Sequence, residues 1–129
     1  MDRIYVNLNY PIGKVDKKIY GHFCEHAFKN IYGGLYDPGN KNSNENGIRM
    51  DVIEKLRKVK PAILRYPGGN FVSNYHWENG IGPKEKRKRV FEYAWLTEES
   101  NQFGTDEFIE VCRLVGAEPY LCINMGTGT

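Results

Sequence analysis

The sequence predicts an α/β fold with parallel strands, and three observations support this prediction. Apolar, strand-like stretches alternate with amphipathic helical stretches along residues 18–124. The expected helix-to-strand links are short, whereas the strand-to-helix links take roughly twenty and forty residues. Three of the expected strands end in a polar side chain, at Glu25, Arg65 and Asn124. Because α/β proteins build their sites at the carboxyl ends of parallel strands, we expect a site there.

The chain begins with two expected strands and a long loop. Residues 4–8 alternate apolar side chains with the period of a strand, and residues 10–13 then break the chain at a proline and a glycine. Residues 18–24 (KIYGHFC) predict a second strand, which ends at Glu25. Glycine pairs and a run of asparagines predict a loop over residues 26–46.

Two helices and two more strands follow. A helix is predicted over residues 48–59, where apolar side chains recur on one face. Residues 62–66 (AILRY) are typical of a buried parallel strand. A second long loop is expected over 67–104, before a helix that Thr105 caps and a glycine ends. Residues 119–124 predict the last strand.

Both a (β/α)8 barrel and a doubly wound sheet accommodate this order. The barrel is favoured because neither glycine cluster opens a helix directly after a strand, as a dinucleotide-binding fold requires. A barrel needs eight strands and roughly 250 residues. This chain of 129 residues supplies three barrel strands and two helices. We therefore expect residues 14–129 to be the first part of a barrel, an incomplete domain.

Composition excludes several classes of function. Hydrophobic residues make up 40% and charged residues 26% of the chain, as in globular proteins. A net charge of +2 is too small to indicate nucleic acid or an acidic membrane as a partner, and the basic run at 84–89 is expected to be a solvated loop. No signal peptide or membrane span is expected. Three cysteines without CxxC spacing fit reduced thiols, so we expect a cytoplasmic protein.

The segment GHFCEH at residues 21–26 allows several kinds of site. In a strand, His22, Cys24 and His26 share one face and Glu25 lies on the other. A metal site is disfavoured because no further ligand pair follows, and a Cys–His nucleophile lacks a third orienting group. We expect no metal and no cofactor. Packed histidines and a polar-ligand pocket with Glu25 as the working residue stay open.

A second candidate segment is RYPGGN at residues 65–70. Arg65 closes a buried strand, where its charge needs an anionic partner. Pro-Gly-Gly allows a sharp turn and places Asn70 as a donor and acceptor of hydrogen bonds, although the same three residues also make ordinary turns. Aromatic residues in the following loop, Trp95 among them, suit either stacking on sugar rings or a small loop core.

Five ordered segments together resemble glycoside hydrolase family 51: IYGHFCEHAFKNIYGGLYDP, NGIRMDVIEKL, ILRYPGGNFVSNYHWENGIGP, ESNQFGTDEF and GAEPYLCINMGTGT. This family comprises α-L-arabinofuranosidases that release arabinose from arabinoxylan, arabinan and their oligosaccharides. The resemblance implies a (β/α)8 barrel followed by a C-terminal β-sandwich, with residues 1–13 as a strand of that sandwich. It also implies retaining hydrolysis by two glutamates, and homo-oligomers that are often hexamers.

The resemblance also implies roles for individual residues. Glu25 and Asn70 would hydrogen-bond arabinose hydroxyls, Arg65 would keep the nucleophile ionised, and Trp95 would border the leaving group. Retaining chemistry needs two carboxyl groups about 5–5.5 Å apart, and only Glu25 stands at an expected strand end here. Both catalytic glutamates are therefore expected beyond residue 129, and the chain alone is expected to be inactive. The alternatives are a non-catalytic carbohydrate-binding or decayed remnant of the same barrel, and another sugar hydrolase of the same clan.

Overall fold

Three short parallel strands form the sheet of the computed structural model, which describes residues 2–128. These strands are β1 (His22–Phe23), β2 (Ile63–Tyr66) and β5 (Glu118–Leu121), and they lie in the order β1-β2-β5. Both pairings are parallel, so all three carboxyl ends meet at one edge of the sheet.

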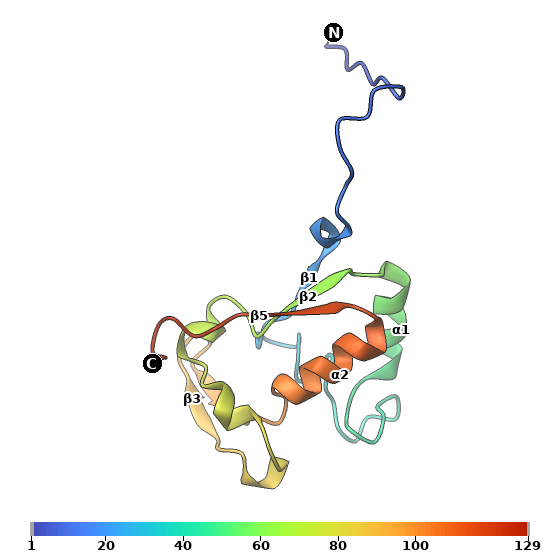
Figure 1. Cartoon of the computed structure of the whole chain (residues 1–129). Helices are drawn as coiled ribbons and strands as arrows, with labels where there is room; N and C mark the ends of the chain where they lie inside the picture. Colours follow the sequence, from blue (N-terminus) through green and yellow to red (C-terminus); the bar gives the residue numbers. More distant parts are fainter. Residues whose placement is uncertain (1, 129) are drawn as a thin grey trace.

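Two helices cover one side of this sheet, as Figure 1 shows. They are α1 (Met50–Val59) and α2 (Thr105–Val115), which confirms both predicted helices. One predicted detail is wrong: Thr105 is the first helical residue, and Gly104 is the N-cap. Gly104 has no side chain that could cap the helix. Its N–H donates to the Glu107 carboxylate at 2.8 Å, which ties the N-cap to the first turn.

The core lies between the helices and the sheet. Tyr66 of β2 stacks on Phe108 of α2, with ring centroids 4.6 Å apart and planes 13° from parallel. The loop that follows β1 closes the core with further apolar side chains, since Ile31 and Ile48 are fully enclosed. The remaining buried members are Cys24, Leu35, Tyr36, Ile53, Leu64, Phe103, Val111 and Cys112.

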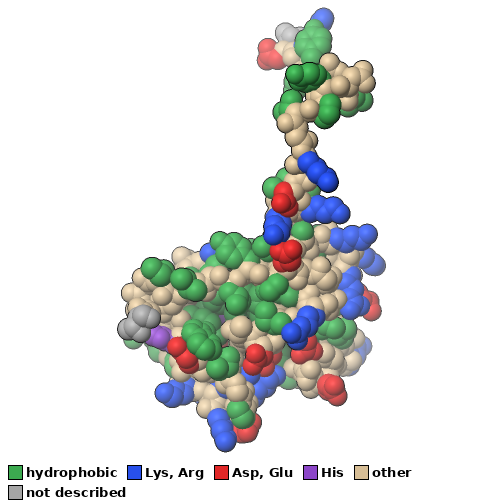
Figure 2. All heavy atoms as spheres, viewed as in Figure 1, with side chains coloured by type: hydrophobic (Ala, Val, Ile, Leu, Met, Phe, Trp, Pro, Cys, Tyr) green, Lys and Arg blue, Asp and Glu red, His purple; other side chains and the backbone are tan. Residues whose placement is uncertain are grey.

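The strand predicted at residues 4–8 is wrong for this structure. Residues 2–15 form no strand and run away from the body as an exposed arm, as seen in Figures 1 and 2. Ile4 is 93% and Leu8 is 88% exposed. A strand is stable only when its backbone pairs with another strand, and none of residues 2–128 supplies that partner here.

The strand predicted at residues 18–24 is much shorter than expected. Lys17–Tyr20 form a 3-10 helix instead, because the Asp16 carboxylate accepts from the Lys18 N–H at 2.8 Å and caps that turn. Only His22–Phe23 pair with β2 as a strand. The backbone continues alongside β2 for a few residues beyond, through Cys24 and His26.

The long loop predicted at 67–104 contains structure that the sequence analysis missed. The strands β3 (Val90–Glu92) and β4 (Thr97–Glu99) form an antiparallel hairpin. The Glu92 carboxylate shapes its turn, accepting from the Ala94 and Trp95 N–H groups at 2.7 Å each. Three short 3-10 helices precede the hairpin, at Phe71–Asn74, Trp77–Gly80 and Lys84–Lys86.

The basic run at 84–89 is only partly the solvated loop that was expected. The side chain of Arg87 is 3% exposed and forms two hydrogen bonds of 3.0 Å with the Glu107 carboxylate. Lys84 lies 3.6 Å from the same carboxylate. These two cations therefore fasten the loop to α2, and a smaller basic surface is left than the sequence indicates.

The order β1-β2-β5 occurs both in a (β/α)8 barrel and in one half of a doubly wound sheet. That these strands belong to a closed barrel therefore stays a prediction. No helix within residues 2–128 combines the length and the apolar character that a membrane crossing requires.

Candidate functional site

The end of β1 and the turn after β2 lie against each other and enclose Glu25. The Cys24 N–H donates to the Arg65 carbonyl at 2.7 Å, and the His26 N–H donates to the Pro67 carbonyl at 3.1 Å. These two bonds extend the strand pairing across Glu25. Its half-buried side chain crosses to the turn, where Oε1 accepts from the N–H groups of Gly69 at 3.0 Å and Phe71 at 3.1 Å.

Gly68 makes this close approach possible. Its φ of +140° is one that L side chains rarely adopt, and a Cβ here would lie 2.7 Å from the carboxyl carbon of Glu25. The neighbouring Gly69 has open space where its Cβ would stand. The first glycine of the turn is therefore required by Glu25, and the second is not.

Asn70 lies on the same turn, between the two backbone amides that hold Glu25. It is exposed, and it precedes the 3-10 helix Phe71–Asn74 without capping it through its side chain. The structure thus brings Glu25 and Asn70 to one place at the strand ends, with the amide of Asn70 open to solvent.

Arg65 lies between two aromatic rings. The register places Phe23, Arg65 and Tyr120 in one row across the three strands. The guanidinium carbon is 5.1 Å from the Phe23 ring centroid and 6.0 Å from that of Tyr120. Within residues 2–128 Arg65 forms no ion pair, so the anionic partner expected for it is not supplied by this part of the chain.

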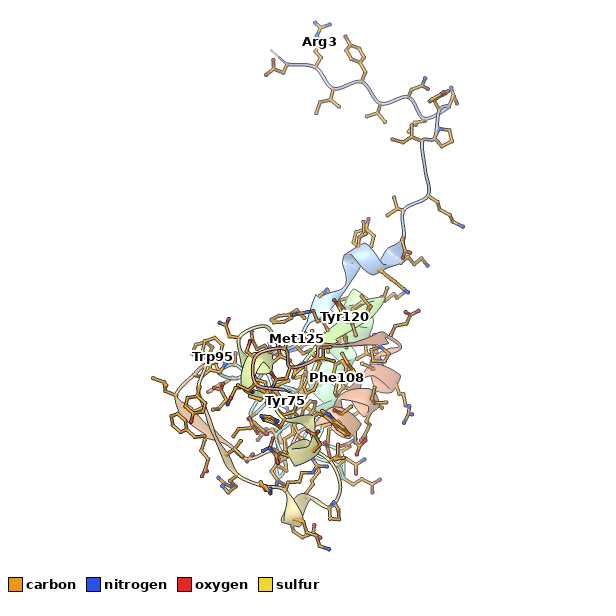
Figure 3. All side chains as sticks on the ribbon, turned by 60° about the vertical axis from the view of Figure 1, so that its left-hand side comes forward. Arg3, Tyr75, Trp95, Phe108, Tyr120 and Met125 are labelled. Carbon is orange, nitrogen blue, oxygen red and sulfur yellow. The ribbon has the colours of Figure 1, made fainter. Side chains whose placement is uncertain are left out.

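Trp95 stands in the turn of the hairpin, at the edge of the body in Figure 3. Its ring packs on Phe28, with centroids 5.1 Å apart. Phe28 follows Glu25 by three residues, so the hairpin tip touches the segment that carries Glu25. The Nε1–H of Trp95 is buried and has no hydrogen-bond acceptor among the residues that the structure describes.

His26 is a packed histidine with polar partners on both sides. Its side chain is 2% exposed, and its ring stacks on Phe71 with centroids 4.4 Å apart. Nε2 is 2.9 Å from the Tyr66 hydroxyl, and Nδ1 is 3.2 Å from Oε2 of Glu99. His22, by contrast, is exposed. Within residues 2–128 no three His, Cys, Asp or Glu side chains are arranged to hold a metal ion.

Glu99 is the residue of this region that the sequence analysis missed. Its carboxylate also accepts from the Tyr32 hydroxyl and, at 2.6 Å, from the Asn101 N–H. Burial raises the pKa of Glu99, but the neighbouring His26 and the hydrogen bonds from the Tyr32 hydroxyl and the Asn101 N–H outweigh burial and hold this pKa below the ordinary value of 4.5. Adjacent glutamates in a strand face opposite sides, so Glu98 and Glu99 could have indicated one inward carboxylate.

An apolar groove of about 710 Å³ runs beside the end of β5. Hydrophobic side chains gather on the surface in Figure 2, and Figure 3 labels Met125, which lines the groove, and Tyr120, which is exposed beside it on β5. The other large apolar side chains exposed at this end of the chain are Leu121 and Ile123.

Comparison with known proteins identifies the family. The sequence profile of the alpha-L-arabinofuranosidase 1 domain matches residues 55–129. The solved family 51 (GH51) α-L-arabinofuranosidase of Thermotoga petrophila is 60% identical with a TM-score of 0.87, over 89% of this chain and 24% of that one. The chain belongs to the family 51 α-L-arabinofuranosidases. The predicted resemblance is therefore confirmed.

Other family 51 relatives show the same coverage. An α-L-arabinofuranosidase C of Emericella nidulans is 56% identical over 126 residues, which are 98% of this chain and 25% of that protein. The Thermotoga maritima α-L-arabinofuranosidase, solved as an arabinose complex, is 62% identical with a TM-score of 0.84, over 85% of this chain and 23% of that one. The chain thus spans about a quarter of the length of its family 51 relatives.

Proposed function

We propose that this chain is the sugar-binding part of a retaining α-L-arabinofuranosidase. The enzyme would release terminal, non-reducing arabinofuranosyl residues from arabinoxylan, arabinan or arabino-oligosaccharides. One observation carries the proposal: at the strand ends, the backbone N–H groups of Gly69 and Phe71, on either side of Asn70, hold the carboxylate of Glu25 beside that residue. The arabinose complex of the Thermotoga maritima relative supports a sugar as the ligand.

The hydrogen bonds of Glu25 suit this role. Both amides, those of Gly69 and Phe71, donate to Oε1, which leaves Oε2 to accept from a sugar hydroxyl. The exposed amide of Asn70 can donate to one hydroxyl and accept from another. Trp95, whose ring packs on Phe28, would border the leaving-group side.

The two catalytic glutamates would come from sequence beyond residue 129. The buried carboxylates of this chain are already engaged: Glu92 by the hairpin turn, Glu99 by His26 and Glu107 by Arg87. Arg65 forms no ion pair within residues 2–128, which supports a position beside it for the nucleophilic carboxylate. The positive charge of Arg65 would lower the pKa of that carboxylate. The chain alone would then be inactive, because retaining hydrolysis needs two carboxyl groups about 5–5.5 Å apart.

Two further expectations belong to the same proposal. The exposed apolar side chains of the N-terminal arm support the assignment of residues 1–13 to the strand of a second, β-sandwich domain. A cytoplasmic location is supported by a relative from Acetivibrio thermocellus, 50% identical over 125 residues, which is named an intracellular exo-α-(1→5)-L-arabinofuranosidase.

The proposal can be tested by the kinetics of a chimaera. In this chimaera, residues 1–129 replace the matching N-terminal quarter of the Thermotoga maritima relative. The chimaera should hydrolyse an aryl arabinofuranoside, and Glu25→Ala should lower kcat/KM by roughly ten- to a hundred-fold, because a hydrogen bond to a charged group is lost. Asn70→Ala should cost less, since its hydrogen bonds are neutral. A chelator should not change kcat/KM of the chimaera or of either variant.

Two outcomes would contradict the proposal. Near-normal kcat/KM in Glu25→Ala would remove this residue from the sugar site. Activity that a chelator abolishes and zinc restores would instead support a metal site at GHFCEH.

A further inference from the structure

A buried contact joins the two segments that carry the candidate site. His26 follows Glu25 directly at the end of β1, whereas Glu99 lies on β4, in the hairpin whose turn carries Trp95. The Nδ1 atom of His26 and the Oε2 atom of Glu99 are 3.2 Å apart, and these side chains are only 2% and 6% exposed. The contact therefore links the strand end to the base of the hairpin in a place that water does not reach.

The hairpin touches the same segment a second time, at its tip. There the ring of Trp95 packs on Phe28, on the surface of the body. The other ion pair of the hairpin, Arg89–Glu98, is more than half exposed on both sides and ties the two strands only to each other. Glu99 is thus the buried anchor between the hairpin and the segment at 25–28.

The hydrogen bonds of Glu99 explain why a carboxylate is needed. Oε1 accepts from the Tyr32 hydroxyl and the Asn101 N–H, and Oε2 faces Nδ1 of His26. A glutamine of the same size would place an NH2 group at one of these two positions. At the Oε1 position it would leave the Tyr32 hydroxyl and the Asn101 N–H without their acceptor, and at the Oε2 position it would replace the carboxylate oxygen beside Nδ1 of His26, although the packing volume would not change.

We propose that Glu99 is a positioning residue of the arabinofuranosidase site: through His26 it holds the hairpin, and with it Trp95, in place relative to Glu25. This inference rests on the function proposed above and adds a residue that touches no sugar. It requires that the effect of Glu99 on turnover pass through Trp95.

A double-mutant cycle in the chimaera tests this requirement. With an arabino-oligosaccharide as substrate, Glu99→Gln and Trp95→Ala should each lower kcat/KM by roughly ten-fold, mainly through KM. The double variant should be no worse than the worse single variant within about three-fold, because Glu99→Gln has nothing left to misplace once Trp95 is gone. Glu98→Gln is the matched control: it makes the same chemical change one residue away, on the exposed face, and should leave kcat/KM unchanged.

The possible outcomes separate the inference from the proposed function. Turnover by the chimaera, and its loss in Glu25→Ala, test the function without reference to Glu99. Losses that multiply in the double variant, or unchanged kinetics in folded Glu99→Gln or in Trp95→Ala, would overturn the inference alone. A merely structural Glu99 would lower the melting temperature but leave KM of the folded enzyme unchanged.

A second variant applies if Glu99→Gln does not fold. Tyr32→Phe keeps the ring and removes one donor from Glu99 while the contact with His26 remains. A several-fold loss of kcat/KM that disappears in the Trp95→Ala background would support the inference. An unchanged kcat/KM, or a loss that multiplies with that of Trp95→Ala, would overturn it.

Discussion

At the scale of single residues, three buried carboxylates stand out in this fold. Glu92, Glu99 and Glu107 are 4–6% exposed, and each one accepts at least two hydrogen bonds, from backbone N–H groups, the Tyr32 hydroxyl or the Arg87 guanidinium. An isolated buried charge is costly, whereas one enclosed by donors is tolerated. Glu99 and Glu107 fasten the loop from 67 to 104 and the helix that follows it, whereas Glu92 shapes the hairpin turn within that loop.

Acid should therefore destabilise the fold in a way that depends on Glu99. The pKa values of Glu99 and Glu107 are lowered from 4.5 in the folded state, despite burial, because hydrogen bonds and positive charges outweigh it. The unfolded chain then binds more protons near pH 4.5, so this stabilisation is complete above that pH and is lost as the pH falls below it.

Thermal melts of the chimaera from neutral pH down to about pH 3 measure this effect. Glu99→Gln should melt lower at neutral pH and lose less on acidification than the parent. Glu54→Gln is the control, because the exposed side chain of this helical residue forms no hydrogen bond or ion pair in the described part of the chain. Equal acid dependence in all three proteins would contradict the role assigned to Glu99.

At the scale of elements, the turn at 67–70 decides how Glu25 is presented. Gly68→Ala should lower kcat/KM of the chimaera about as much as Glu25→Ala, since the new methyl group would overlap the carboxyl group of Glu25 and the backbone would be strained. Gly69→Ala is the matched control, because its Cβ meets no atom within 4 Å and its N–H still donates to Glu25. Equal activity in both variants would show that the turn does not set the position of this carboxylate.

The same elements show what could be read from the sequence. Both helices were predictable because each has its own apolar stripe and a stop signal at its end. The short length of the strand at 22–23 and the hairpin at 90–99 were not, since strand length and pairing depend on partners distant in the chain. Glu25 is a candidate in the sequence because a polar residue ends an apolar strand, and Asn70 because it follows a Pro-Gly-Gly turn, whereas Glu99 lies in a hairpin that the sequence does not reveal.

At the scale of the whole molecule, an unpaired sheet edge and a group of apolar side chains are exposed together. The outer edge of β5 pairs with no strand among residues 2–128, and Tyr120, Leu121, Ile123 and Met125 beside it are 46–83% exposed. An open edge beside an apolar surface promotes aggregation.

Expressed alone, the 129-residue chain should therefore be insoluble or molten, and it should not hydrolyse an aryl arabinofuranoside. Amide dispersion in NMR spectra and a thermal melt check the first statement, with the chimaera as the soluble control. A sharp, cooperative melt of a monomer with well-dispersed amide signals would contradict it.

The central claim is that Glu25 and Asn70 bind arabinose at the strand ends. A crystal structure of the chimaera with L-arabinose tests it most directly. In that structure, Oε2 of Glu25 and the side-chain amide of Asn70 should lie within about 2.5–3.2 Å of sugar hydroxyls, and Oε1 of Glu25 should still accept from the N–H groups of Gly69 and Phe71. An arabinose bound elsewhere, or one at the strand ends that touches neither side chain, would contradict the claim.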